Sequence, residues 1–222
     1  MTMVKAYHGH EGFSLSGNGK GYRGVFYSNL LCNKAGVCLI FDESQTGFGR
    51  TGKRFAFEHF GVYPDIMVVG EFMTGGMFPM TAMVFTKELK RFFDVHPLIH
   101  LSTFGGHDVG CLVASAALDE YERTRPWENA LEQGTTIMNE LRSVMESNDY
   151  IKSLNGLGLL ISLSLSSSEI VSRLGFSASK NGILVRKGTV DNCCVIIRSS
   201  LLITADEAES IIWGIKAAIN DL

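Results

Sequence analysis

Two short apolar runs joined by a glycine-rich turn constrain the fold of this chain more than any other stretch. The runs cover residues 37–41 and 66–69, and they have the continuous apolar character of strands that are buried on both faces. Between them lie the glycine-rich turn and a predicted helix over residues 55–60. This order predicts a strand–helix–strand unit whose two strands are parallel neighbours.

Polar or small residues follow each run. The first run is followed by the tetrapeptide DESQ at residues 42–45, and the second by Gly70 and Glu71. Ligands of open α/β sheets bind beyond the carboxyl ends of the strands, so we expect a binding site at this edge. The residue types alone define a site there, without specifying a reaction.

The same stretch resembles the class III aminotransferases, which have the fold type I architecture of pyridoxal phosphate (PLP) enzymes. The matching words are YHG (7–9), LIFDESQTGFGRTGK (39–53), GVYPDI (61–66), TGG (74–76), STFGG (102–106) and RSSLLIT (198–204). They span most of the chain in the order of the family, and the long central word is highly specific. The resemblance implies an α/β fold: a reduced PLP-binding large domain and a small C-terminal α/β domain.

The resemblance also implies roles for the residues beyond the first strand. Asp42 corresponds to the aspartate that keeps the pyridine nitrogen protonated, so that the ring can accept electrons from a substrate carbanion. Gln45 corresponds to the glutamine that bonds the ring hydroxyl, and Ser44 stands where the family usually has a valine against the ring face. Tyr7 and His8 match an aromatic word that stacks on the other face.

Two further matches concern the phosphate and the substrate. Thr103 resembles the threonine that reaches the phosphate of the neighbouring subunit's cofactor, which would make the site depend on a homodimer. Arg198 corresponds to the arginine that clamps the substrate carboxylate, where a bidentate fork gives orientation as well as affinity. Arg50 and Lys53, in the central word, are expected to solvate the glycine-rich loop.

Position 71 departs from the family. The Schiff-base lysine precedes the TGG word in the family, whereas this chain has Gly70-Glu71 there. A glutamate cannot form an imine, so we expect PLP or pyridoxamine phosphate (PMP) to bind non-covalently or not at all. In a desolvated site, burial and like charge would raise the pKa of the Glu71 carboxyl, and the group could serve as an acid or base. Decay of the site and a one-base codon change are the competing explanations.

Length also departs from the family. No sequence before Tyr7 supplies the first phosphate-binding loop of the family, and the segment between Gly24 and Val37 is short. The lost strands would expose sheet edges and apolar faces, so we expect a rearranged fold, pairing with another chain, or an extensive homodimer contact. The proposed division is 1–125 for the remnant of the PLP-binding domain and 126–222 for the small domain.

Composition excludes several classes of protein. The chain has 222 residues, of which 45% are hydrophobic, and a formal charge of −3, so it is expected to be globular and to bind no nucleic acid. It has no apolar run long enough to span a membrane. Its five cysteines fit no disulfide or metal spacing, which favours a cytoplasmic location. The metal-ligand types at His8, His10, Asp42 and Glu43 are a weak signal, so no metal is expected.

Three functions stay open at this point. The first is an aminotransferase-like protein with a remodelled site for a small amine- or carboxylate-bearing metabolite, with Glu71 as its acid or base. The second is a genuine PLP-dependent transaminase, represented by an altered or partial chain. The third is a non-catalytic scaffold or partner subunit that uses the dimer surface of the family.

Overall fold

The computed structural model describes residues 6–8, 20–145, 148–189 and 191–222. These residues form two compact units. The first unit contains β1 together with Tyr22–Phe48 and Phe55–Arg125, and the second contains Gly49–Arg54 and Pro126–Leu222. The sequence had assigned residues 49–54 to the first domain, whereas the structure packs this short inserted segment with the second unit.

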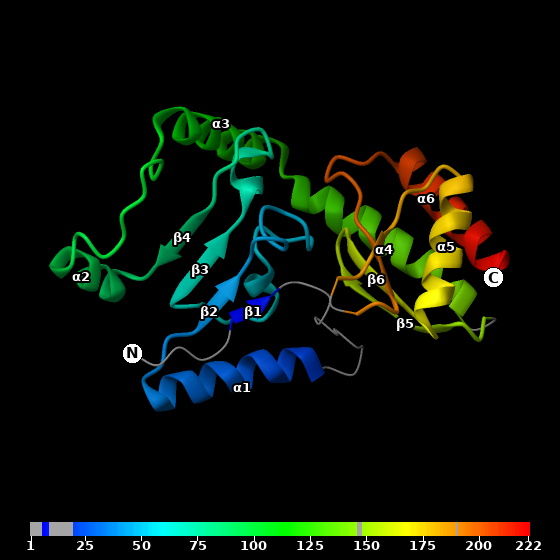
Figure 1. The fold of residues 1–222 in the computed structure, drawn as a ribbon, viewed down its shortest axis with the longest axis horizontal. Coiled ribbons are helices and arrows are strands. Elements are labelled where there is room, and N and C mark those ends of the chain that lie inside the picture. The colour runs from blue at the N-terminus through cyan, green and yellow to red at the C-terminus, as the bar shows by residue number, and fades with distance from the viewer. Residues whose placement is uncertain (1–5, 9–19, 146–147, 190) are drawn as a thin grey trace. The chain divides into compact units, whose positions relative to one another are not determined.

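A four-stranded mixed sheet forms the centre of the first unit (Figure 1). Its strands, in spatial order, are β1 (Ala6–His8), β2 (Ile40–Asp42), β3 (Ile66–Val69) and β4 (Ala82–Phe85). β1, β2 and β3 are parallel and β4 is antiparallel, which confirms the predicted parallel pairing of β2 and β3. The expected burial of β2 on both faces is wrong for the described chain, because Ile40 and Asp42 are only half-buried.

Helices connect and flank these strands. They are α1 (Lys20–Ala35), the 3₁₀ helices η1 (Ala56–His59) and η2 (Glu71–Thr74), α2 (Lys87–Val95) and α3 (Asp108–Thr124). η1 corresponds to the helix predicted over residues 55–60. α3 ends at Thr124; its C-cap residue Arg125 has a left-handed φ of 47° and directly precedes Pro126, at which a new helix begins.

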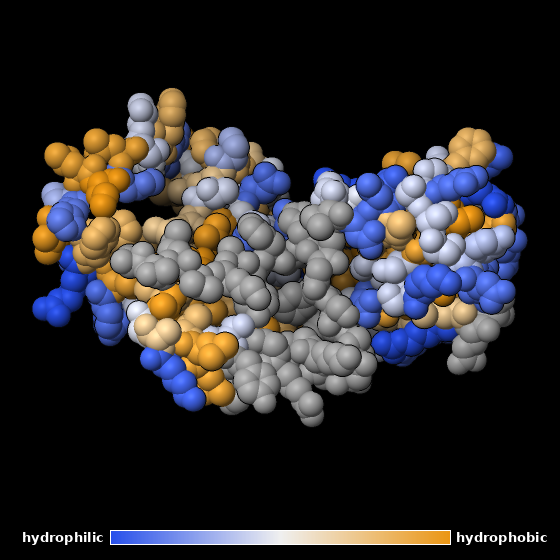
Figure 2. Space-filling model, turned by 60° about the horizontal axis from the view of Figure 1, so that its bottom comes forward, coloured by the Kyte–Doolittle hydropathy of each residue, from blue (hydrophilic) through white to orange (hydrophobic). Residues whose placement is uncertain are grey.

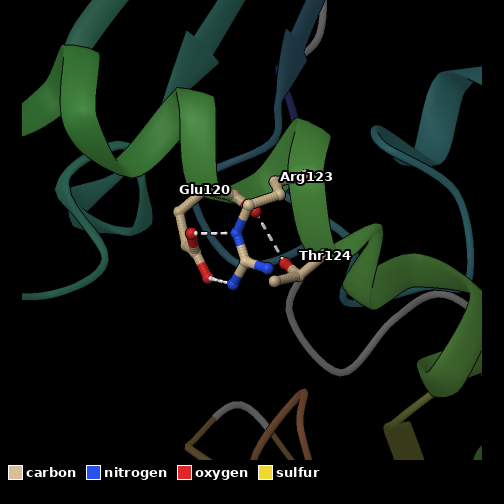
Figure 3. Close-up of polar contacts among 3 residues, drawn as sticks. All are labelled: Glu120, Arg123 and Thr124. Atoms are coloured by element: carbon tan, nitrogen blue, oxygen red, sulfur yellow. Dashed lines mark hydrogen bonds and ion pairs between the residues drawn. The ribbon is translucent and has the colours of Figure 1, made fainter.

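Polar contacts close the last turn of α3 (Figure 3). The Arg123 guanidinium donates to both carboxylate oxygens of Glu120, with Nε–Oε2 and Nη2–Oε1 distances of 2.8 and 2.5 Å. The Thr124 hydroxyl donates to the main-chain carbonyl of Glu120 at 2.7 Å. The charged pair is solvent-exposed, so it contributes little to stability.

The second unit is an antiparallel sheet with three long helices. Its elements are α4 (Pro126–Met145), β5 (Ile151–Leu157), β6 (Leu160–Leu165), α5 (Ser168–Lys180), β7 (Arg186–Lys187), β8 (Cys194–Ile197) and α6 (Ala205–Asn220). The strand order is β5-β6-β8-β7, and all pairs are antiparallel. Thr204 and Glu207 form a reciprocal capping box at the start of α6, in which each side chain bonds the main-chain N–H of the other residue.

One hydrophobic core lies between the helices and the sheet of this unit. α4 packs against α6 and β5, and α5 packs against α6. The core includes Ile137, Leu141, Leu163, Leu174 and Ile215, all of which are at most 1% exposed. Burying a side chain of this size contributes about 2 kcal/mol, so these helices are held mainly by packing.

Close approaches of main chain seat the inserted segment Gly49–Arg54 within the second unit. Gly158, in the turn between β5 and β6, has a φ of 53°, and a Cβ built on it would lie 2.6 Å from the amide nitrogen of Gly52. A Cβ on Gly134 of α4 would lie 2.0 Å from the Gly158 carbonyl oxygen. The Leu159 N–H donates to the Arg50 carbonyl at 3.0 Å. Glycine is therefore required at positions 134 and 158 for these three segments to touch.

Large apolar side chains remain exposed on the first unit. α2 has no buried residue, and Met77, Leu101, Phe104 and Leu112 are each at least 72% exposed. Figure 2 shows hydrophobic side chains gathered on the surface of this unit. None of the helices in the described part of the chain has the length and apolarity needed to cross a bilayer.

Candidate cofactor and substrate site

The carboxyl ends of three parallel strands lie side by side in the first unit. His8 of β1 pairs in register with Asp42 of β2, and Asp42 pairs with Val68 of β3. Beyond these ends, a Cβ built on Gly70 would lie only 2.6 Å from the Ser44 carbonyl oxygen. The segments that follow β2 and β3 are therefore in direct contact, which is the arrangement that the sequence predicted for a binding site.

Asp42 is half-buried at the end of β2, and the turn after it folds back onto its side chain. Its Oδ1 accepts a hydrogen bond from the Ser44 N–H at 3.0 Å. Such a turn fixes the side-chain rotamer of the aspartate. Ser44 and Gln45 are also half-buried. A carboxylate in this position can hold a proton on a heterocyclic nitrogen, and a carboxamide beside it can bond a hydroxyl.

Glu43 is the residue of this segment whose importance the sequence reasoning missed. It is 2% exposed, and it accepts hydrogen bonds from the Thr46 hydroxyl and from the N–H groups of Ala56 (3.0 Å) and Phe57 (2.8 Å). The buried carboxylate therefore ties the end of β2 to the start of η1. Desolvation by burial raises the pKa of this carboxyl, and the three hydrogen bonds oppose the rise.

The signal that could have identified Glu43 is an alternation of burial along the chain. Leu39 and Phe41 point into the interior, with exposed fractions of 1% and 5%, and Glu43 continues that alternation by two residues. A carboxylate at an interior position must find hydrogen-bond donors. Thr46 in the turn that follows and the first two N–H groups of η1 supply them.

Glu71 begins η2, immediately after the end of β3. Its main-chain carbonyl accepts a hydrogen bond from the Thr74 hydroxyl at 2.8 Å, and Thr74 is 0% exposed. The Tyr121 hydroxyl of α3 bonds the next carbonyl, that of Phe72, at 2.9 Å. The Glu71 side chain itself is exposed, so the desolvation expected from the sequence is not found in the described chain. The main chain is fixed and the carboxylate faces solvent.

An aromatic stack connects α3 with the glycine-rich turn. The ring of Phe48 stacks on Tyr121 with centroids 5.6 Å apart and meets Phe55 edge-on at 5.4 Å. Phe48 has a φ of 58°, which is uncommon for a residue with a side chain. The surrounding rings compensate for this strained conformation at the edge of the candidate site.

For the remaining predicted cofactor residues, the structure gives their place in the fold but no side-chain contact at the candidate site. Tyr7 and His8 lie in β1, and their side chains are outside the described part of the structure. Thr103 is exposed in the turn that precedes α3. His10, the other weak metal-ligand candidate, is outside the described residues. Among the residues that are described, no three His, Cys, Asp or Glu side chains are grouped to hold a metal ion.

Arg198 belongs to the second unit, where it directly follows β8 and is exposed. Arg50, expected to solvate the glycine-rich loop, is instead 5% exposed, and its Nη1 donates to the Ser199 carbonyl at 2.6 Å. That expectation is wrong for Arg50, because Gly49–Arg54 is enclosed by the second unit. Lys53 of the same segment is exposed, as expected.

Comparison with known proteins agrees with this architecture. The sequence profile of the class III aminotransferases matches residues 25–219. The chain is 34% identical to a putrescine aminotransferase of Pectobacterium atrosepticum, over 86% of this chain and 41% of that protein. It is 34% identical to an acetylornithine aminotransferase of Methanocaldococcus jannaschii, over 73% of this chain and 38% of that protein. The chain therefore belongs to the class III aminotransferase family.

Solved structures show the same fold. An acetylornithine aminotransferase from Elizabethkingia anophelis superimposes with a TM-score of 0.81 and 31% identity, covering 92% of this chain and 52% of that one. An S-selective transaminase from Arthrobacter sp. gives a TM-score of 0.83 and 26% identity, covering 90% and 47%. The fold is that of the PLP-dependent transaminases, and the chain spans about two fifths of the length of the curated relatives it matches.

Proposed function

We propose that this chain carries an aminotransferase-derived site for PLP or PMP and for a small amine- or carboxylate-bearing metabolite, without ordinary lysine-dependent transamination. The observation that carries the proposal is the position of Glu71. It begins η2 one residue after the end of β3, and Gly70 before it lies against Ser44, at the position where the resemblance places the Schiff-base lysine. A carboxylate there can move a proton, but it cannot bind PLP covalently.

The residues at the strand ends fit the cofactor in part. Asp42 would hold the proton of the pyridine nitrogen, and Gln45 would bond the ring hydroxyl. Ser44 would lie against one face of the ring. When bound, the cofactor supplies an electron sink for the substrate carbanion. Arg198 would orient a substrate carboxylate, and Glu71 would take or give the proton at the substrate carbon. The group that is missing from this set is the lysine amine.

The test is an absorbance titration of the full chain with PLP and with PMP, followed by borohydride reduction and intact-mass measurement. We expect a saturable spectral change with PMP and no mass increase after reduction with PLP. Asp42→Asn should abolish the spectral change, because a neutral amide does not keep the pyridine nitrogen protonated. A tight, borohydride-reducible PLP adduct on the unchanged protein would overturn the proposal.

A reconstruction separates this function from genuine transamination by an altered or partial chain. Glu71→Lys should gain a reducible PLP adduct, mapped by peptide mass to position 71, whereas the matched variant Glu71→Gln should not. If Glu71→Lys gains no adduct under saturating PLP, the cofactor site assigned to the strand ends is refuted. The sequence identity to aminotransferases of known substrate is what favours this second candidate.

We also propose that the first unit pairs with a second chain of the same kind, either a copy of itself or a longer class III aminotransferase. The exposed apolar side chains Met77, Leu101, Phe104 and Leu112 support this proposal. Light scattering after size exclusion should give a dimeric mass, and Leu112→Glu should lower it to the monomer. A monodisperse monomer of the unchanged chain at micromolar concentration would contradict self-pairing.

A further inference from the structure

Arg50 is a buried cation that the family-based roles do not use. It is 5% exposed within the inserted segment Gly49–Arg54. The segment is closed on itself by hydrogen bonds from the Gly49 N–H to the Arg54 carbonyl (3.1 Å) and from the Gly52 N–H to the Gly49 carbonyl (3.0 Å). Arg50 therefore stands on a short, rigid loop inside the second unit.

The main chain and the side chain of Arg50 bond different parts of that unit. Its carbonyl accepts from the Leu159 N–H at 3.0 Å, which fixes it against the turn between β5 and β6. Its Nη1 donates to the Ser199 carbonyl at 2.6 Å, at the end of β8. Hydrogen bonds from a charged donor are short and strong, so this one fixes the main chain directly after Arg198.

The rest of the loop after β8 is held by other anchors. The Asn129 side-chain amide of α4 donates to the carbonyls of Leu201 (2.8 Å) and Ile203 (3.0 Å). The Ser200 hydroxyl accepts from the Leu202 N–H at 3.2 Å. These contacts act on residues 200–203, whereas the Arg50 contact acts on the residue adjacent to Arg198.

We propose that Arg50 is a positioning residue for Arg198, and that it thereby sets the preference of the site for carboxylate-bearing substrates. The inference rests on the proposed role of Arg198 as the carboxylate clamp. Because Arg50 is buried and bonds a main-chain carbonyl, it acts through the Ser199 peptide rather than on the ligand. A bidentate arginine–carboxylate pair depends on the direction of the guanidinium plane, so a shift of its main chain weakens the pair.

The test compares two probes of the same size on the full chain, pentanoate and pentanamide, by saturation-transfer NMR. The unchanged protein should prefer pentanoate. Arg198→Met should abolish the preference. Arg50→Met should reduce it about five- to tenfold while the affinity for pentanamide stays the same. Arg50→Lys should restore part of the preference, because it keeps a charged donor at the same position.

Lys53→Met is the matched control, because it removes a cation from the same segment at an exposed position. It should leave the ratio of the two affinities unchanged. Hydrogen exchange gives an independent readout: Arg50→Met should speed amide exchange over residues 199–203 about tenfold, and Lys53→Met should not. Arg50→Lys serves both measurements if Arg50→Met does not fold.

The outcomes separate the two levels of the proposal. A preference that is lost in Arg198→Met but intact in Arg50→Met and Arg50→Lys overturns the positioning role and leaves the carboxylate clamp standing. A preference that survives in Arg198→Met, or is absent from the unchanged protein, refutes the clamp and the positioning role together. Unchanged exchange over residues 199–203 in both Arg50 variants refutes the positioning role alone.

Discussion

The two units of this chain differ in how they treat their apolar residues. In the second unit, α4, α5 and α6 close a core over the sheet, and Leu174 and Ile215 are 0% exposed. In the first unit, α2 buries no residue, and Leu101 and Leu112 are 75% and 72% exposed. The second unit thus closes a large core within the described chain, although Leu184 and Phe176 on its surface are 90% and 67% exposed, whereas α2 of the first unit contributes no buried side chain.

This difference indicates where each unit gets its stability. The free energy from apolar burial scales with the area removed from water, so the second unit obtains its share from contacts within the described chain. The first unit adds buried polar contacts, such as those of Glu43 and Thr74, to its apolar burial. The proposed cofactor residues lie mainly in this unit.

The largest loss of stability should come from adding a side chain at Gly158, where the main chain of the inserted segment touches the rest of the second unit. Gly158→Ala adds a methyl group within 2.6 Å of the inserted segment, at a φ that a side chain disfavours. We expect a loss of about 4 kcal/mol in the free energy of unfolding, measured by urea denaturation. Gly175→Ala is the control, because Gly175 lies within α5 and its new Cβ would meet only the Val185 side chain, at 3.9 Å. It should stabilise by about 0.5 kcal/mol. A similar effect of the two changes would contradict the packing described for Gly158.

A matched pair of leucines tests the comparison between the units directly. Leu174→Ala empties a fully buried site in the second unit and should cost about 3 kcal/mol. Leu112→Ala removes the same atoms from an exposed site in the first unit and should change the free energy of unfolding by less than about 0.5 kcal/mol. Chemical denaturation at low protein concentration measures both. A large loss in Leu112→Ala that grows with protein concentration would mean that a second chain covers this side chain.

The buried carboxylate of the first unit should give a pH signature. The pKa of Glu43 is raised above its ordinary 4.5, so folding favours its protonated form. Its contribution to stability is full below about pH 4.5 and is lost as the pH rises through the folded pKa. Glu43→Gln should lower the free energy of unfolding by about 1 kcal/mol at low pH. This difference between the unchanged protein and the variant should narrow as the pH rises. A gap that widens with pH would show that the hydrogen bonds outweigh desolvation.

Glu120→Gln is the exposed control in the same unit. The bond to Arg123 lowers the pKa of this carboxyl, so any contribution has the opposite sign: it is present above the ordinary pKa and lost on acidification. Both side chains are exposed, and solvent screens the pair. No measurable change in the unfolding midpoint is therefore expected at neutral pH.

Local patterns predicted much of the fold. An apolar stripe at residues 208, 211, 212, 215 and 219 predicts one buried helix face, and the sequence TADE at residues 204–207 predicts a capping box before it. The structure confirms both in α6, together with the predicted parallel pairing of β2 with β3. Each of these features depends on residues that are close in sequence or on one continuous apolar run that forms a single strand or helix. The family and its fold were identifiable from the long central word.

The errors arise where distant segments meet. The short apolar run at residues 183–185 predicts a strand there, but the strand lies at Arg186–Lys187, because pairing with β8 sets its position. The helical spacing of apolar residues over 129–145 predicts Leu131 on the buried side of α4, but Leu131 is 50% exposed. The burial of Arg50 could not be predicted, since nothing near it in sequence shows that the second unit encloses it. The roles assigned to the strand-end residues and to Arg198 remain predictions that the titrations above would test.

The inserted segment has a consequence for genetic dissection of this protein. A fragment encoding only residues 126–222 would lack the six residues of the inserted segment, which pack against Gly158 and Leu159. Recombination or truncation between residues 125 and 126 therefore yields a fragment that lacks part of its own buried interior. To transfer the second unit intact, both Gly49–Arg54 and Pro126–Leu222 must be moved together. The folding unit is therefore not one continuous stretch of the gene.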